Sequence, residues 1–133
     1  MTRAAQQHDF WRRTTSRRRE VSPIERRTHI ALADHLRIAC RPGWWWSHVP
    51  SGEHRSEKTG ALLKRMGTQR GMLDFLLIAP SGAHHWMELK RGNAPLTDAQ
   101  KAFIEQLDHR GVPHAIARSY DDAVQQLKTW GVL

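Results

Sequence analysis

Two carboxylates and one ammonium group interrupt neighbouring apolar runs of the sequence. Asp74 lies inside MLDFLLI, and Glu88 and Lys90 lie inside HHWMELK. A charge in a buried strand is costly unless a partner charge or a metal ion compensates it. Glu88 and Lys90 are two residues apart, so they share one face of a strand, with Leu89 facing the core between them. The three charged groups therefore need a common explanation.

The turn signal APSGA joins the two runs into a predicted hairpin. If the turn is centred near Ser81 and Gly82, Asp74 lies opposite the segment from Trp86 to Lys90, within reach of Glu88. Two adjacent carboxylates repel each other unless a cation lies between them. The hairpin thus predicts a pair of carboxylates that could hold a cation.

A hard cation such as Mg²⁺ binds oxygen ligands, often one or two carboxylates together with phosphate and water. Asp74, Glu88 and the backbone carbonyl of Leu89 can supply such ligands. Lys90 has no lone pair, so it would instead hold an attacking water and neutralise phosphate charge. The metal would lower the pKa of that water and stabilise charge on the scissile phosphate. This set of groups is suited to phosphodiester hydrolysis.

A purely structural explanation competes with this chemistry. Asp74 could accept hydrogen bonds from backbone N–H groups at the end of a ladder. Glu88 and Lys90 could form an ordinary ion pair on a half-exposed strand, and such pairs are common and contribute little stability. The hairpin taken alone leaves both explanations open.

Capping residues, turns and apolar periodicity predict the order of the remaining elements. Helices are expected over about 23–39, 57–66, 98–110 and 120–130, and strands over 44–49, 72–78, 84–90 and 114–117. This order excludes sandwich folds and requires a mixed sheet flanked by helices. Residues 1–20, MTRAAQQHDFWRRTTSRRRE, are predicted to form a flexible basic arm, and residues 21–133 a single domain.

Charge and cysteine content limit the functions that the chain can have. Lys and Arg number 21 against 13 Asp and Glu, a formal net charge of +8 over 133 residues. Such a surplus is expected of a protein that contacts phosphates, and also of a merely soluble basic protein. Cys40 is the only cysteine, so an internal disulfide and a cysteine-based zinc site are excluded. No apolar run is long enough to span a membrane, and the N-terminus lacks a secretory signal.

Histidine and tryptophan residues are weaker signals. The nine histidines are scattered, and only His84 and His85 are adjacent. They are predicted to be surface or partly buried groups and not a zinc cluster. In the WWW run, Trp44 and Trp46 share one face and are expected to pack in the core. Trp11 and Trp45 are the aromatic residues expected to be exposed, where a base could stack on them.

Basic residues on both sides of the carboxylates form a candidate phosphate track. The alternative for each of them is a solvated basic helix face. The predicted DNA-contacting residues are Arg55, Lys58, Lys64, Arg65, Arg70 and Arg91.

The arrangement of an aspartate, a spacer and ELK resembles the PD-(D/E)XK nuclease signature, which is short by itself. Three longer segments make the resemblance more specific: HVPSGEHRSEKTGALLKRMGTQRGMLDFLLI, WMELKRGNAPLTDAQKAFIEQL and ARSYDDAVQQLKTWG. Together they are similar to the small stand-alone VRR-NUC domain nucleases of phage and bacterial type. The similarity runs from about Ser22 to Gly131.

The resemblance implies a restriction-endonuclease-like α/β core of order αβββαβ, which matches the order predicted above. It implies an Mg²⁺- or Mn²⁺-dependent endonuclease that cuts DNA, selectively at branched structures such as flaps and Holliday junctions. It also implies the cytoplasm of a bacterial cell or a phage-infected host as the location. A homodimer is expected by analogy with stand-alone family members, because a symmetric four-way junction suits two active sites.

Within the family pattern, Asp74 and Glu88 would be metal ligands and Lys90 the catalytic lysine. Glu25 would be the carboxylate of the first helix, and Gln100 the polar residue that opens the helix after the motif. Both also fit capping boxes, behind Ser22 and Thr97 respectively, so capping is an alternative role for each. The chain departs from the family at Leu73, where a proline is usual, and at Ser51–Gly52, where Asn-Gly is frequent.

Two other classes of function compete with the endonuclease. A non-catalytic DNA-binding module could have kept the fold, although the intact aspartate and ELK set argues against it. A basic RNA-binding or ribosome-associated protein would explain the charge. That class gives no reason for Asp74 and Glu88 to lie in apolar strands.

Overall fold

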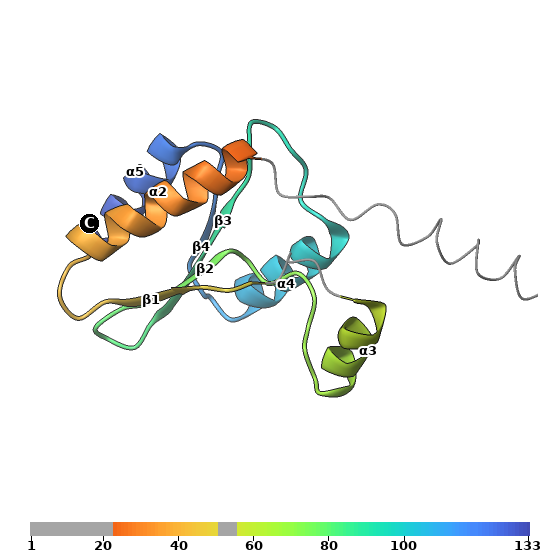
Figure 1. Ribbon diagram of the computed structural model, residues 1–133. Helices are drawn as coiled ribbons and strands as arrows, with labels where there is room; N and C mark the ends of the chain where they lie inside the picture. The colour runs from red at the N-terminus through yellow and green to blue at the C-terminus, as the bar shows by residue number, and fades with distance from the viewer. Residues whose placement is uncertain (1–22, 51–55) are drawn as a thin grey trace, which may run out of the picture.

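The computed structural model describes residues 23–50 and 56–133 (Figure 1). The predicted basic arm, Trp11, Ser22 and Arg55 lie outside these ranges. The elements follow one another as α2 (Pro23–Ala39), β1 (Trp45–His48), α3 (Glu57–Arg65), β2 (Phe75–Ile78), β3 (His84–Leu89), α4 (Asp98–His109), β4 (His114–Ala117) and α5 (Tyr120–Trp130). This is the order predicted from the sequence.

The four strands form one mixed sheet in the order β1-β2-β3-β4. The β1–β2 and β2–β3 pairs are antiparallel, and the β3–β4 pair is parallel. In the hairpin, Phe75 faces Met87 and Ile78 faces His84. This register brings the position of Asp74 next to that of Glu88, as the turn chemistry predicted.

Helices cover both faces of the sheet (Figure 1). Buried side chains of α2 and α5, such as Leu32, Leu36 and Leu127, pack with Phe75 and Met87 into the main apolar cluster. Successive strand residues point to opposite faces. Trp86 therefore lies on the other face, where its ring meets Phe103 of α4 edge-on with the centroids 5.0 Å apart.

The structure corrects the predicted strand ends. The strand expected from Met72 begins only at Phe75, so Asp74 precedes β2 and does not lie within it. The strand expected to reach Lys90 ends at Leu89. The cause at β2 is local, because the N–H of Asp74 donates to the side chain of Glu88 and not to a backbone carbonyl of the ladder. The charged residues thus lie at one end of the two central strands, here called the edge of the sheet.

Two peripheral features agree with the sequence predictions. Trp45 is 53% exposed, whereas Trp44 and Trp46 pack against the core. α3 has no buried residue and extends from the side of the molecule in Figure 1. Within the described ranges, none of the helices has the length and apolar character needed to cross a membrane.

Candidate active site

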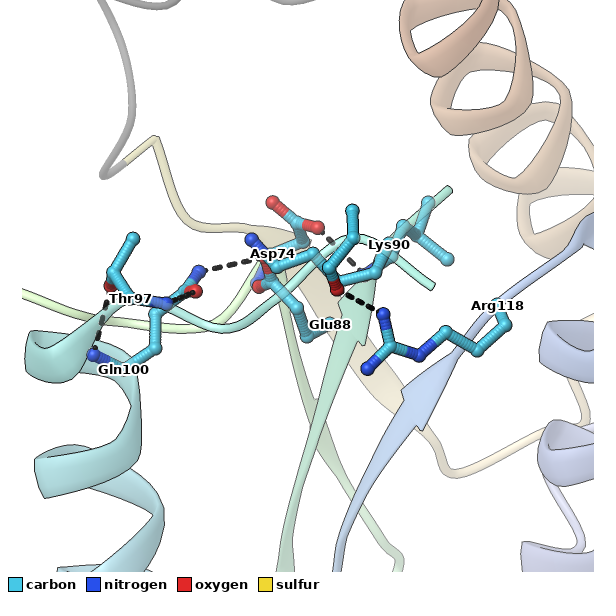
Figure 2. A network of polar contacts seen from close by, with 8 residues as sticks. Asp74, Glu88, Lys90, Thr97, Gln100 and Arg118 are labelled. Carbon is cyan, nitrogen blue, oxygen red and sulfur yellow. Dashed lines mark hydrogen bonds and ion pairs between the residues drawn. The ribbon is translucent and has the colours of Figure 1, made fainter. Parts of the chain in front are cut away.

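Asp74 and Glu88 are joined by a reciprocal exchange of hydrogen bonds at the end of the hairpin (Figure 2). The N–H of Asp74 donates to Oε2 of Glu88 at 3.0 Å. In return, the N–H of Leu89 donates to Oδ2 of Asp74 at 2.8 Å. Asp74 therefore does accept a backbone N–H, as the structural explanation required, and the same bond fixes its carboxylate beside Glu88.

The backbone carbonyl of Asp74 ties the site to the edge strand. Its oxygen lies 2.8 Å from the N–H of Val49 and 2.9 Å from Nδ1 of His48. Since a carbonyl oxygen only accepts, both groups donate to it. Asp74 is thus held from both neighbouring strands, which fixes its position.

Glu88 is buried and each of its carboxylate oxygens is engaged. Oε1 accepts a hydrogen bond of 2.8 Å from Nε2 of Gln100 and lies 3.5 Å from Nζ of Lys90. Lys90 is itself largely buried. The predicted alternative, an ordinary pair on a half-exposed strand, is therefore wrong for these two residues.

Burial raises the pKa of Glu88 to about 7, and the neighbouring charge of Asp74 adds to this effect. Lys90 and the hydrogen bonds from Gln100 and Asp74 oppose it. A carboxylate with such a pKa is readily ionised by a nearby cation, because the cation stabilises the charged form. Strongly perturbed pKa values of this kind are concentrated at functional sites.

Gln100 caps α4 and also contacts Glu88, so its two predicted roles do not exclude each other, and its part in catalysis stays a prediction. Its Oε1 accepts from the N–H of Thr97 at 3.0 Å, and its own N–H donates to Oγ1 of Thr97 at 3.1 Å, which completes the capping box. Its Nε2 donates to Glu88. The side-chain amide therefore connects the start of α4 to the buried carboxylate, as Figure 2 shows.

Gly71 is a positioning residue that the sequence analysis missed. It has a φ of +83°, and a Cβ atom there would lie 2.2 Å from the carbonyl oxygen of Ala99. Only glycine allows the segment before Asp74 to pack so closely on the first turn of α4. The signal in the sequence was a glycine three residues before the aspartate.

Arg118, the residue after β4, holds the loop that follows Lys90. Its guanidinium donates to the carbonyl oxygen of Ala94, in the loop that leads from Lys90 to α4 (Figure 2). The N–H of Lys90 also donates to the carbonyl of Ala117 at 2.9 Å. Both contacts hold the segment after β3 against β4, and neither was predicted.

Two histidines lie close to Asp74, contrary to the expectation of scattered, unclustered histidines. His29 of α2, His48 of β1 and Asp74 each offer a metal-binding atom within 4.8 Å of the others. Burial lowers the pKa of His29, and the neighbouring His48 adds to this, whereas Asp74 opposes it. His29 lies on the helix face of Leu32, Ala33 and Leu36, a pattern that could have identified it as inward-facing.

The other predicted site residues are less closely defined. Glu25 lies in the first turn of α2, on the same helix face as His29 and one turn before it. Its role as a metal ligand or as a cap stays a prediction, as does the role of the Leu89 carbonyl. The predicted DNA-contacting residues within the described ranges are all exposed: Lys58, Lys64, Arg65, Arg70 and Arg91.

The donor set at this edge fits a divalent cation. Asp74 and Glu88 supply carboxylate oxygens, which are the ligands that Mg²⁺ and Mn²⁺ prefer. Burial, and then the neighbouring charge of Asp74, raise the pKa of Glu88, and a bound cation would offset both effects.

Solved structures with the same fold share one description. A "VRR_NUC domain protein" matches with a TM-score of 0.53 and 27% identity, over 65% of this chain and 66% of that chain. The fold is that of a VRR-NUC domain. A second structure, described as "VRR_NUC domain", is 18% identical and has a TM-score of 0.52, over 77% of this chain and 91% of that one. The sequence itself matches no protein-family model and no curated protein.

The VRR-NUC fold confirms the predicted class, a mixed sheet flanked by helices in a restriction-endonuclease-like arrangement. This chain spans about two thirds of the length of the first matching protein. A VRR-NUC fold is a nuclease-type fold and is consistent with the PD-(D/E)XK superfamily. The aspartate and ELK motif, with Asp74, Glu88 and Lys90, lies at one end of the central strands β2 and β3 of that fold.

Proposed function

We propose that this chain is a metal-dependent endonuclease that hydrolyses phosphodiester bonds of DNA. One observation carries the proposal: Asp74, Glu88 and Lys90 form a fixed, largely buried cluster at the sheet edge of a nuclease-type fold. An ion pair of Lys90 and Glu88 with a purely structural role would not need a second carboxylate, that of Asp74, whose charge adds to the effect of burial in raising the pKa of Glu88.

Each residue of the cluster has a distinct task in this proposal. Asp74 and Glu88 hold an Mg²⁺ or Mn²⁺ ion, with Gln100 fixing the orientation of Glu88 through its amide. When bound, the ion lowers the pKa of water and stabilises charge on the scissile phosphate. Lys90 donates hydrogen bonds to the attacking water or to a phosphate oxygen, and it compensates their negative charge.

The partner proposed for this site is DNA, preferentially branched or flapped. The net charge of +8 favours a polyanion, and the exposed basic residues of α3 and the adjoining loop precede Asp74 in the chain. A homodimer in the cytoplasm would present two such sites to a symmetric junction. The competing function is a DNA-binding module without catalysis.

A single incubation experiment separates these functions. Pure protein is mixed with linear duplex, flapped and four-way-junction DNA, in Mg²⁺, in Mn²⁺ and in chelator. We expect cleavage only with metal and most rapidly on a branched substrate. Binding without cleavage under every metal condition would favour the non-catalytic module. Equal cleavage of all three substrates would keep the nuclease and reject the preference for branched DNA.

A further inference from the structure

We propose that His29, His48 and Asp74 form a second cation site that binds divalent transition-metal ions such as Co²⁺ and Zn²⁺ in preference to Mg²⁺. The three residues come from α2, from β1 and from the segment before β2. Their candidate ligand atoms all lie within 4.8 Å of one another. The site shares Asp74 with the proposed catalytic cluster, but it concerns metal binding and does not depend on nuclease activity.

The tautomer of His48 is fixed by its hydrogen bond to the backbone. Nδ1 of His48 lies 2.9 Å from the carbonyl oxygen of Asp74, which can only accept. Nδ1 therefore carries the proton, and Nε2 keeps its lone pair. This is the usual arrangement of a metal-binding histidine, whose second ring nitrogen donates to a carbonyl or carboxylate that orients the ring.

His29 offers a buried nitrogen that needs a partner. Among the described residues, its Nε2 is buried and has no hydrogen-bond partner. A buried polar atom without a partner costs free energy, and a bound cation would recover it.

Phe75 supports both imidazole rings from the core side. Its ring centroid lies 4.5 Å from that of His29 and 6.0 Å from that of His48. The two imidazoles meet nearly at right angles, with centroids 4.3 Å apart. In a tetrahedral site with bonds of about 2.0–2.1 Å, neighbouring ligand atoms lie about 3.4 Å apart. Rotations that move the ligand atoms by about an ångström would therefore complete the site.

The ligand chemistry sets the preference among metals. Imidazole nitrogen suits Zn²⁺ and its transition-metal neighbour Co²⁺, whereas Mg²⁺ prefers oxygen and keeps its water. Glu88 is not one of the three residues of this site, and both of its carboxylate oxygens are already hydrogen-bonded inside the protein. The histidine site and the carboxylate pair therefore differ in the class of cation they favour.

Titration of the full, tag-free chain with Co²⁺ alone tests this site without any activity assay. We expect visible d–d absorption typical of a low-coordinate nitrogen and oxygen site, removed by Zn²⁺ and not by excess Mg²⁺. His29→Gln and His48→Gln should each weaken Co²⁺ binding at least ~10-fold, as loss of a ligand or its support does. His84→Gln, at an exposed histidine on β3, is the matched control and should bind as wild type does.

Two results would overturn the proposal. One is wild-type protein that gives no Co²⁺ spectrum, or a spectrum that His29→Gln and His48→Gln leave unchanged. The other is Co²⁺ binding that Glu88→Gln abolishes while both histidine variants retain it, which would assign the cation to the carboxylate pair alone. If His29→Gln fails to fold, His48→Gln, at an exposed strand position, still decides the question.

Discussion

Two ion pairs of this protein differ in the distance between their charged atoms and, far more, in how exposed their side chains are. Arg37 and Asp34 approach to 2.9 Å on the outside of α2, where their side chains are 64% and 61% exposed. Lys90 and Glu88 are farther apart, at 3.5 Å, with side chains 13% and 6% exposed. In the second pair, burial and the neighbouring charge of Asp74 raise the pKa of Glu88. Burial and a second carboxylate, and not a short distance, therefore distinguish the candidate active site.

The exposed pair of Arg37 and Asp34 is the reference for an ion pair that has no role in catalysis. An exposed pair contributes about 0–1 kcal/mol, because water competes for both charges. A buried pair with an additional carboxylate is costly to keep and is retained at sites where charge is used. Changing each pair separately shows how much each one contributes to cleavage and to stability.

Replacing the two cations should give the largest contrast. We expect Lys90→Met to lower metal-dependent cleavage at least ~100-fold, because it removes the group that compensates developing negative charge. Arg37→Met should cleave as wild type does, although it also loses the contact of the guanidinium with the Trp46 ring at 5.8 Å. Single-turnover rates and DNA affinities of both variants provide the measurement. Full-rate cleavage by Lys90→Met would remove that residue from the mechanism.

The pH dependence of stability should reveal the burial of Glu88 directly. The folded-state pKa of about 7 lies above the ordinary value of 4.5. The contribution of Glu88 is therefore complete below pH 4.5 and is lost as pH rises through 7, by on the order of 3 kcal/mol. Relative to wild type, metal-free Glu88→Gln should gain about that much stability between pH 4.5 and pH 8, measured by urea unfolding. A difference that does not change with pH would contradict the buried, strained carboxylate.

Two glycine substitutions disturb the support of the buried pair without changing any charge. Gly67→Ala meets no atom within 4 Å and should cost only about 1–2 kcal/mol, for its φ of +100°. Gly71→Ala carries a similar strain and also places its Cβ against the backbone of Ala99. We expect Gly71→Ala to lose about 1 kcal/mol or more of unfolding free energy beyond the loss in Gly67→Ala, measured in urea, and to cleave DNA more slowly. Equal effects at both positions would mean that the close packing beside α4 does not position Asp74.

Gln100→Glu should give the smallest effect. Glutamate can still complete the capping box, but it loses the donor to Glu88 and adds a carboxylate beside it. We expect a loss of about 1 kcal/mol at pH 8 and a smaller loss at pH 5, where carboxylates share protons more readily. Gln106→Glu on the same helix, where Arg110 already donates to the side chain, is the control and should be neutral. A loss of the same size at both positions would count against a special role of Gln100.

Local signals in the sequence were sufficient for the fold. Caps such as Thr97 and Ser119, and the turn at Ser81–Gly82, predicted the order of elements and the hairpin register. These features depend on neighbouring residues, so they can be read without tertiary structure. The exact start of β2 could not be predicted in this way, because the ladder stops where the N–H of Asp74 donates to the carboxylate of Glu88.

The candidate site was only partly readable from sequence. Asp74, Glu88 and Lys90 lie in one hairpin, and their pairing followed from strand parity. His29 and His48 come from a helix and an edge strand whose packing brings them to Asp74, so no spacing in the sequence marks them as a pair. Gln100 appeared to have two alternative roles because the sequence does not show that its amide oxygen and its amide nitrogen have different partners. In the structure the oxygen accepts from Thr97 and the nitrogen donates to Glu88.

The assignment of the active site can be tested with two variants, Glu88→Gln and Asp34→Asn, whose cleavage of a four-way junction is compared in Mn²⁺ at pH 8. The first neutralises the buried carboxylate and should leave a folded protein of equal or higher stability. The second neutralises the exposed one. We predict a loss of at least ~100-fold for Glu88→Gln, with DNA affinity kept within a few-fold, and a wild-type rate for Asp34→Asn. Wild-type cleavage by Glu88→Gln would contradict the assignment of this edge of the sheet as the active site.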